Sequence, residues 1–301
     1  MSLVINHNLM AMNAQRNLSE AYGALSDSTR KLSSGLRINS AADDAAGLAI
    51  RELMRADIAS LHQGSRNAND AISLIQTADG ALGVIDEKLI RMKELAEQAA
   101  TGTYTSDQRM IIDSEYQAMA SEITRIANAT DFNGIQLLNG NLSADGPGTT
   151  THDGSTMVAT GALKVHFGTA NDSAQDYYHI QISNSTASAL GVGNNSVEGA
   201  GYSISTQQAA QNSLEALNEA ITSKDNIRAN LGALQNRLQN TITNLDIQAE
   251  NLQAAESRIS DVDVAKEMTE FVRNQILTQS AVAMLSQANS LPQMAMQLIG
   301  G

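Results

Sequence analysis

The sequence predicts a mainly α-helical protein, in which long coiled-coil-like helices from both chain ends form a rod and the middle carries a β-hairpin and a small β-rich insert. Three observations lead to this fold class. Proline occurs only as Pro147 and Pro292, and a proline inside a helix costs about 3 kcal/mol. Aromatic residues make up only 3% of the chain, so small and straight side chains must fill the packing. Apolar residues also recur at spacings of three and four over long stretches.

Three helices are expected in the first half of the chain. The second follows the stretch LSSGLRINSAADDAAGLAI at residues 32–50 and has an apolar line from Ala68 to Ala96. The Thr-Gly-Thr at 101–103 separates it from a third helix at 106–128, which we expect to return antiparallel. The first helix has a seam spaced by four and three, which consists of Leu18, Tyr22, Leu25, Thr29, Leu32 and Leu36.

The second half contains the longest pattern. Steps of three and four from Leu214 to Ile259 give 14 positions, ten of which are Leu, Ile or Ala. This seam predicts a helix of about 45 residues, about 70 Å long, which needs partner helices to be stable. The exceptions are Lys224, Arg228, Gln235 and Glu256. A last helix repeats the rhythm at Leu277, Ala281, Met284, Ala288, Leu291, Ala295 and Leu298.

The middle of the chain, about residues 131–203, has a different character. The stretch TDFNGIQLLNG holds two Asn-Gly turn signals, at 133–134 and 139–140, around a short apolar run. Apolar and polar residues then alternate in LKVHF at 163–167 and in YYHIQIS at 177–183. Both segments are expected to be half-buried strands.

Charge and composition exclude several classes of function. The net charge of −13 argues against nucleic-acid binding and against docking on an anionic membrane. Cysteine is absent, so neither disulfides nor cysteine-based metal sites can form. The N-terminus lacks the basic and long apolar regions of a cleavable signal peptide, and no run of 18 apolar residues predicts a membrane span.

Both chain ends lack ionic side chains. Residues 1–15 and residues 274–301 contain no Asp, Glu, Lys or Arg, although both are amphipathic. Alone they would bury too little apolar area to offset the entropy of ordering. We therefore expect both ends to become buried, or to line a neutral aqueous surface, in an assembly.

Asp43 and Asp44 are adjacent carboxylates in the stretch that separates the first two helices. Neighbouring residues on a helix point about 100° apart, so the two acids would not share a catalytic site. Ser40 and Asp43 instead have the S-x-x-[DE] spacing of a capping box, and Asp44 would complement the helix dipole. We expect a helix start at this joint.

No pattern of catalytic or metal-binding residues stands out. The histidines lack the i, i+4 spacing of a helical zinc site, and no nucleophile elbow, phosphate-binding loop or dinucleotide fingerprint occurs. The sequence therefore predicts no catalytic residue, no metal, no cofactor and no enzymatic activity. The five histidines are His7, His62, His152, His166 and His179.

The two ends of the chain resemble bacterial flagellin. The N-terminal resemblance covers about residues 1–140 and includes INHNLMAMNAQRNL, KLSSGLRINSAADDAAGLAI, QTADGALGVIDEKLIRMKELAEQAATGT and DFNGIQLLNG. The C-terminal resemblance covers about residues 204–301 and includes IRANLGALQNRLQNTITNL, AESRISDVDVAKEM and ILTQSAVAMLSQANSLPQMAMQLI. Residues 141–203 match no general pattern of the family, which varies in this region.

The resemblance implies a structural subunit that polymerises into the extracellular flagellar filament for swimming motility. Residues 1–42 and 259–301 would form the inner layer around a central channel. Residues 43–140 and 204–258 would form the helical rod with its β-hairpin, and residues 141–203 the outward-facing insert. The assembly seam of the inner layer would consist of Leu18, Leu25, Leu32, Leu277, Met284, Leu291 and Leu298.

The resemblance also implies partners. The subunit would be secreted unfolded by the flagellar type III system, with an export chaperone bound at its C-terminal end, and would meet filament cap and hook-junction proteins. Flagellins of many motile bacteria are recognised on the rod by a host Toll-like receptor. The matching positions here are Arg91, Leu95, Gln98 and Glu115, and Arg91 and Leu95 are i, i+4 neighbours on a helix.

Three alternatives remain beside the filament subunit. A hook–filament junction protein of the same family would share the ends more loosely and should lack the full SAADDAAGLAI run. A flagellin with a metalloprotease insert would need H-E-x-x-H, which is absent. A pore-forming or translocator protein would have continuous apolar hairpins, whereas Asn and Gln interrupt these helices.

Overall fold

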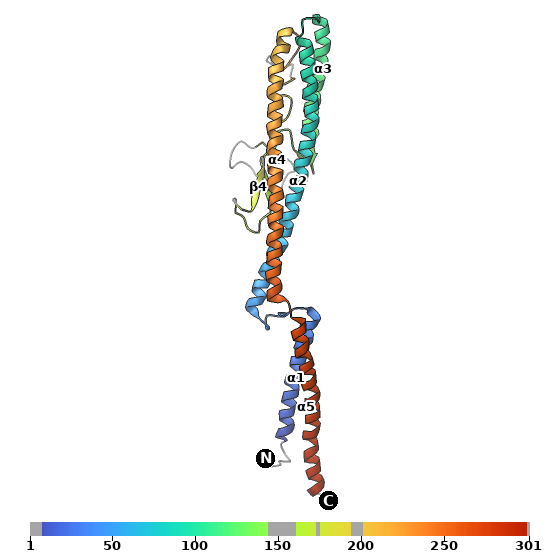
Figure 1. Cartoon of the computed structure of the whole chain (residues 1–301), viewed down its shortest axis with the longest axis vertical. Helices are drawn as coiled ribbons and strands as arrows, with labels where there is room; N and C mark the ends of the chain where they lie inside the picture. The colour runs from blue at the N-terminus through green and yellow to red at the C-terminus, as the bar shows by residue number, and fades with distance from the viewer. Residues whose placement is uncertain (1–7, 144–160, 173–174, 194–200, 300–301) are drawn as a thin grey trace. The chain divides into compact units, whose positions relative to one another are not determined.

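The computed structural model describes residues 8–143, 161–172, 175–193 and 201–299 (Figure 1), with the backbone alone at 291–293 and 295–299. The mainly α-helical fold class is confirmed. The chain forms two compact units, a terminal unit of Met1–Ile58 and Glu250–Gly301 and a central unit of Ala59–Ala249. The elements in order are α1 Leu9–Ser34, α2 Ala45–Ala100, α3 Ser106–Ala129, β1 Asp131–Phe132, β2 Ile135–Gln136, β3 Leu163–His166, β4 Tyr177–Ile180, α4 Gln207–Ser260 and α5 Val264–Ile299.

In the terminal unit, α1 and α5 run antiparallel and side by side (Figure 1). The Asn8 side chain caps α1 by accepting from the Ala11 N–H, and it donates to the Ala288 carbonyl of α5 at 2.8 Å. The least exposed positions of each helix follow a spacing of three and four, typical of coiled coils. They are Ala11, Ala14, Leu18, Ala21, Leu25, Ser28 and Leu32 on α1, and Phe271, Asn274, Thr278, Ala281, Leu285 and Ala288 on α5.

The face of α1 that meets α5 differs from the predicted seam at Tyr22 and Thr29. Tyr22 is 52% exposed and Thr29 is also exposed, so both lie beside the face on which they were expected. Ala21 and Ser28, one residue earlier in each case, occupy the face instead. Small side chains at these positions let the two backbones approach closely, and they leave little apolar area buried between α1 and α5.

In the central unit, α2, α3 and α4 lie side by side and share one apolar core (Figure 1). Fully buried side chains come from all three helices, for example Leu89, Ile123 and Leu217. The seam predicted from 214 to 259 lies in a helix of 54 residues, about 80 Å long at 1.5 Å per residue. The connection between α2 and α3 is short, and the antiparallel return of α3 follows the Thr-Gly-Thr separator as expected.

Three polar pairs join α2 to α4 at the edge of this core. Lys224 is 2% exposed, and its ammonium lies 2.6 Å from the Asp86 carboxylate of α2. Two more exposed pairs flank it: Lys93 donates to Asn218 at 2.8 Å, and Arg228 donates to Asp79 at 2.7 Å. Lys224 and Arg228 interrupt the apolar seam in the sequence because they pair with carboxylates of the partner helix.

Two antiparallel hairpins pack against the helices. The first Asn-Gly signal forms the turn between β1 and β2, with positive φ at Asn133 (52°) and Gly134 (81°), as a type I′ turn requires. β3 and β4 pair from Leu163↔Ile180 to His166↔Tyr177. The predicted strands at 163–167 and 177–183 are thus present but shorter. The second Asn-Gly signal follows β2 without closing a strand pair among the described residues.

The β3–β4 hairpin is fixed to both long helices. The Arg237 guanidinium of α4 lies 3.7 Å from the centre of the Tyr178 ring, and Thr241 of the same helix donates to the Tyr178 hydroxyl at 3.3 Å. On α2, Gly64 lies against the backbone of Phe167, where an added Cβ would come within 2.0 Å of the carbonyl oxygen. Glycine at position 64 therefore permits the close approach of the hairpin to α2.

Lys224→Ala is expected to destabilise the central unit by about 3 kcal/mol, because it leaves the Asp86 carboxylate beside the core without its cation. Arg228→Ala removes a half-exposed pair on the same face of α4 and should cost less than about 1 kcal/mol. Urea unfolding followed by circular dichroism measures both free energies. Equal losses of stability in the two variants would contradict the structural role assigned to the buried lysine.

Candidate interaction surfaces

Residues 35–44 form the joint between α1 and α2 in the terminal unit. Gly35 ends α1 in the left-handed conformation (φ 73°), which glycine adopts without a Cβ clash. Two backbone hydrogen bonds then tie the joint to the loop between α4 and α5. The Arg37 N–H donates to the Ser260 carbonyl at 2.6 Å, and the Val262 N–H donates to the Gly35 carbonyl at 3.0 Å. The ends of α1 and α4 are therefore held together by a segment of sheet-like pairing.

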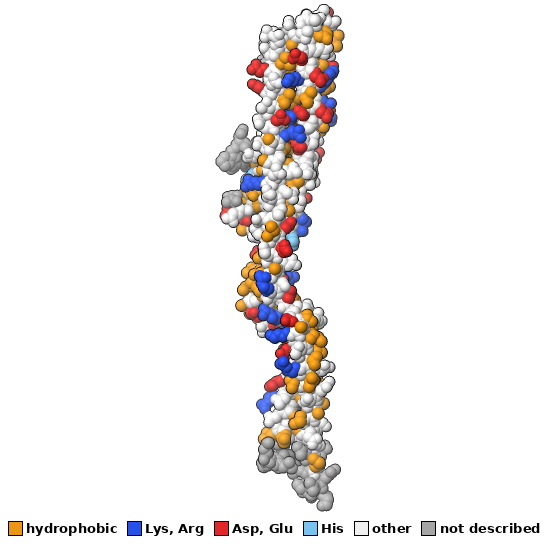
Figure 2. Space-filling view, in the orientation of Figure 1, with side chains coloured by type: hydrophobic (Ala, Val, Ile, Leu, Met, Phe, Trp, Pro, Cys, Tyr) orange, Lys and Arg blue, Asp and Glu red, His pale blue; other side chains and the backbone are white. Residues whose placement is uncertain are grey.

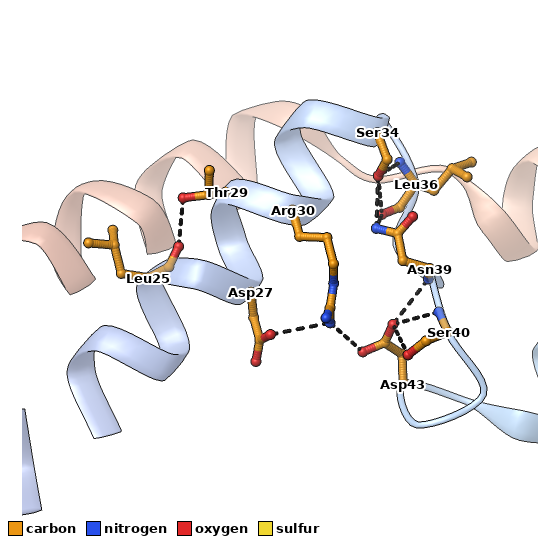
Figure 3. Close-up of polar contacts among 9 residues, drawn as sticks. All are labelled: Leu25, Asp27, Thr29, Arg30, Ser34, Leu36, Asn39, Ser40 and Asp43. Atoms are coloured by element: carbon orange, nitrogen blue, oxygen red, sulfur yellow. Dashed lines mark hydrogen bonds and ion pairs between the residues drawn. The ribbon is translucent and has the colours of Figure 1, made fainter. Parts of the chain in front are cut away.

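Asp43 organises the turn inside this joint (Figure 3). Its Oδ2 accepts the N–H groups of Asn39 at 3.1 Å and Ser40 at 2.9 Å, and also the Ser40 hydroxyl. Its Oδ1 accepts from Arg30 of α1 at 3.0 Å, and Arg30 pairs with Asp27 as well. The backbone hydrogen bonds from Asn39 and Ser40 hold the pKa of Asp43 below its ordinary value of 3.8.

Asp44, rather than Ser40, caps α2. The helix begins at Ala45, so a start capped by Ser40 lies four residues too early. Asp44 Oδ1 accepts the Gly47 N–H at 2.9 Å, the bond that an N-cap side chain makes. The Asp43 carboxylate reaches back to the Ser40 N–H, as the acid of a capping box does, but here it closes a turn that precedes the helix.

Two arginines that the sequence analysis did not single out also hold this joint together. Arg51 of α2 is 8% exposed, and its Nη1 donates to the Ile38 carbonyl at 2.7 Å. The Arg37 Nη2 donates to the Ile259 carbonyl at 2.5 Å, in the last turn of α4, where carbonyls lack intrahelical partners. The position of Arg37 fits the general preference for a cation beside the C-terminal end of a helix, here the end of α4.

The terminal unit buries little and exposes much apolar surface. Among its described residues, only Ile38 and Ala288 are fully buried hydrophobic residues, so it lacks a core of its own. Figure 2 shows hydrophobic side chains along the surface of α1 and α5. The large exposed ones on these two helices are Leu9, Met10, Met12, Tyr22, Val264, Met268, Val272, Ile276, Leu277, Val282, Met284 and Met294.

The expected assembly seam divides between the two sides of this helix pair. Leu18, Leu25 and Leu32 are half-buried on the face of α1 that meets α5. Leu277 and Met284 are 50% and 62% exposed, so they lie off the pairing face and remain free to contact another molecule. The side chains of Leu291 and Leu298 lie outside the described residues.

The four positions matched to receptor recognition do not form one exposed set. Arg91 of α2 and Glu115 of α3 form an ion pair at 2.9 Å, with side chains 48% and 45% exposed. Gln98 is exposed and donates to the Tyr104 hydroxyl at 3.1 Å. Leu95 is only 2% exposed and belongs to the core. The helix face expected to present Arg91 and Leu95 together therefore presents Arg91 alone.

No group of three or more His, Asp or Glu residues in the described segments is arranged to hold a metal ion. His166 and His179 lie on β3 and β4 around Tyr177, with ring centres 6.2 and 5.3 Å from its own. His7 and His152 lie outside the described residues. Across the same described segments, no helix combines the length and hydropathy that a membrane span requires.

Comparison with known proteins gives a consistent result along the whole chain. Residues 5–143 match the family described as "Bacterial flagellin N-terminal helical region", and residues 214–299 match "Bacterial flagellin C-terminal helical region". The chain is 41% identical to flagellin FlaB1 of Treponema pallidum over 297 residues, which cover 99% of this chain and all of that one. It is 43% identical to a flagellin of Bacillus subtilis over 307 residues, which cover 98% of this chain and 99% of that one.

A solved structure adds support for the fold. A protein of Vibrio parahaemolyticus, described as a flagellar hook-associated protein, is 15% identical and superposes with a TM-score of 0.53. The match covers 73% of this chain and all of that one. At this identity the likeness concerns the fold alone.

Asp43→Asn is expected to remove an acid-sensitive step from the joint. Because the folded joint lowers the pKa of Asp43, the stability contributed by its carboxylate is fully present above the ordinary pKa of 3.8. It is lost as pH falls below that value, through the lower pKa of the folded state. Hydrogen exchange at the Asn39 and Ser40 amides, corrected for the intrinsic effect of pH, should lose protection there in the parent and show no such step in the variant.

Asp27→Asn is the control for this measurement. Asp27 lies on α1 and shares Arg30 with Asp43, but the Asn39 and Ser40 amides donate to Asp43 instead, so the variant should keep the parent's pH dependence. Protection of the two amides that is independent of pH in the parent would contradict the assignment.

Proposed function

The chain belongs to the bacterial flagellin family, and we propose that it is the subunit that polymerises into the extracellular flagellar filament for swimming motility. Relatives named flagellin or flagellar filament core protein match it over nearly its full length. The observation that carries the proposal is the exposed apolar surface of α1 and α5 in the terminal unit. Its two long helices expose a dozen large hydrophobic residues and bury almost none, which is typical of a surface that another copy covers.

The two units suit different positions in such a filament. Residues 1–42 and 259–301 would form the inner layer around a channel, where side chains without charge let an unfolded subunit pass. Residues 43–140 and 204–258 would form the surrounding helical layer, stabilised by its own core. Residues 141–203 would face outward. The joint at Gly35 to Asp44 would then set the angle at which one layer leads into the next.

Secretion and partners follow from the same proposal. The subunit would leave the cell unfolded through the flagellar type III system, with an export chaperone on its C-terminal helix. Filament cap and hook-junction proteins would contact it at the two ends of the polymer. The exposed apolar residues of α5 support the binding of a chaperone before assembly, because in this proposal the filament covers these residues only after the subunit has been added.

The hook–filament junction protein of the same family is the alternative. Two observations favour the filament subunit: the complete SAADDAAGLAI run and an identity of 41% to 43% with flagellins over the full chain. A purified subunit should grow long filaments from seeds made of the same chain. A junction protein should add only a short segment to a seed and then stop.

Removal of residues 1–15 or of residues 274–301 is expected to abolish filament growth, because each deletion removes part of the α1–α5 pair. The thermal transition of the central unit, followed by circular dichroism, should stay within a few degrees of the parent, since its core lies in other helices. Electron microscopy of seeded samples measures growth. Filaments of ordinary morphology from either deletion would reject the proposed inner layer.

We also propose that a host Toll-like receptor recognises the central unit through Arg91, Gln98 and Glu115. All three side chains are exposed, with Arg91 and Gln98 two turns apart on α2 and Glu115 on α3. Arg91 is held in place by hydrogen bonds to Glu115 and Glu94. Leu95 would contribute by supporting this surface from the core. Arginine anchors of this kind are common among interface residues that carry most of the binding energy.

Arg91→Ala is expected to weaken receptor signalling by soluble subunit about tenfold or more. Arg125→Ala is a matched control, because Arg125 forms a similar exposed ion pair with Glu122 on α3 and lies outside the proposed contact. A reporter-cell assay on monomeric protein measures the half-maximal concentration of each variant. Unchanged signalling by Arg91→Ala, with the same thermal stability as the parent, would exclude this site.

A further inference from the structure

The pairing of α1 and α5 leaves an open groove along one side of the terminal unit. It has a volume of about 700 Å³, and its lining is mostly apolar or small. Ala14 and Ala21 come from α1, and Leu277 and Ala281 come from α5. Met10 and Met284 line the same groove from opposite helices, with 48% and 62% of their surface exposed. Two thioethers therefore lie in a surface that the proposed function requires another copy to cover.

Sulfur chemistry in this chain is limited to methionine. The sequence contains 12 Met residues and no Cys, so a peroxide has only thioether sulfur to oxidise. The reaction transfers one oxygen atom: the Met thioether and hydrogen peroxide give Met sulfoxide and water, with sulfur oxidised and the O–O bond reduced. The product is polar and carries a strong hydrogen-bond acceptor in place of an apolar atom. A sulfoxide at a contact surface therefore opposes apolar burial.

We propose that Met10 and Met284 form an oxidation site for peroxide-class oxidants, and that a sulfoxide at either position blocks addition of the subunit to the filament. This inference rests on the proposed function, because it concerns the contact between copies. In a free subunit the two thioethers are open to solvent. In a filament the neighbouring copy covers them, so the same residues are oxidised before assembly and protected after it.

The surroundings of the two residues make the groove sensitive to added polarity. Residues 1–15 and 274–301 contain no charged side chain, so contacts made by these segments depend on apolar burial and on amide hydrogen bonds; Glu20 is the charged residue of the groove lining. Asn13, Asn17 and Asn274 line the groove, and their amide groups can solvate a sulfoxide in the free subunit. That solvation favours the unassembled state further, because a neighbouring copy would have to displace it.

Other methionines provide internal comparisons. Met92 is fully buried in the central core, so it should resist oxidation at peroxide doses that convert exposed thioethers. Met110 of α3 is 63% exposed, nearly the same as Met284, but it lies in the central unit. Met284 and Met110 are thus matched in access to the oxidant and differ in position, which separates an effect of the groove from a general effect of oxidation.

The experiment uses the full-length soluble chain. A limited dose of hydrogen peroxide oxidises a fraction of the subunits, short seeds are added, and polymer is separated from soluble protein. Peptide mass spectrometry then gives the sulfoxide fraction at each methionine in both pools. Sulfoxide at positions 10 and 284 should be depleted about tenfold in the polymer relative to the soluble pool. Sulfoxide at position 110 should be equal in the two pools.

A variant tests the same point from the other direction. Met10→Leu with Met284→Leu conserves volume and apolar character, so the double variant should lose less of its polymerisation after peroxide treatment than the parent does, although the exposed Met12, Met268 and Met294 remain open to oxidation. Met110→Leu should keep the sensitivity of the parent chain. Equal sulfoxide at positions 10 and 284 in polymer and soluble protein would overturn the proposal, whatever the variants do. Failure of the untreated parent chain to polymerise would instead reject the proposed function.

Discussion

A helix of more than 50 residues needs a partner along its length, and the pairing of α2 with α4 meets this need in the central unit. Nucleation and propagation energies alone leave long polar helices marginal in water, so the apolar seam between distant parts of the chain holds both helices. A seam of this kind could slide by a heptad and still match apolar residues to apolar residues. The polar pairs disfavour such a slide. Because Asp79, Asp86 and Lys93 are spaced by seven on α2, a slide by one heptad would exchange partners: in one direction it would bring Lys93 against Lys224, and in the other it would leave Arg228 without Asp79.

The sequence patterns located nearly every long element, and the reasons are specific. Spacings of three and four over 214–259 left no alternative to a long helix, and the Asn-Gly at 133–134 could form only a turn with positive φ. The errors concerned which residues of a helix face its partner, and not where the helix lies in the sequence. Leu18, Leu25 and Leu32 fit two neighbouring stripes on a helix, and only the partner α5 decides whether Ala21 or Tyr22 joins them.

The errors at the candidate sites have the same origin. Leu95 seemed to share a surface with Arg91 because i, i+4 residues lie on one face, but α2 packs against α3 and α4 together and its buried stripe is wider than one face. Ser40 and Asp43 have the spacing of a capping box, and nothing in one sequence distinguishes that box from a turn placed directly before the helix. Lys224 seemed to interrupt the seam, whereas Asp86 supplies its counter-charge from 138 residues away.

The contrast between the two units explains why one chain can be both stable and ready to assemble. The central unit has a continuous apolar core of its own, and paired charges join two of its helices at the edge of that core. The terminal unit has small residues and the polar Ser28 and Thr278 between its helices, so the pair gains little from its own contact. Its large apolar side chains point outward instead. In the proposed filament, neighbouring copies would supply the burial that the terminal unit lacks, so assembly would lower its free energy.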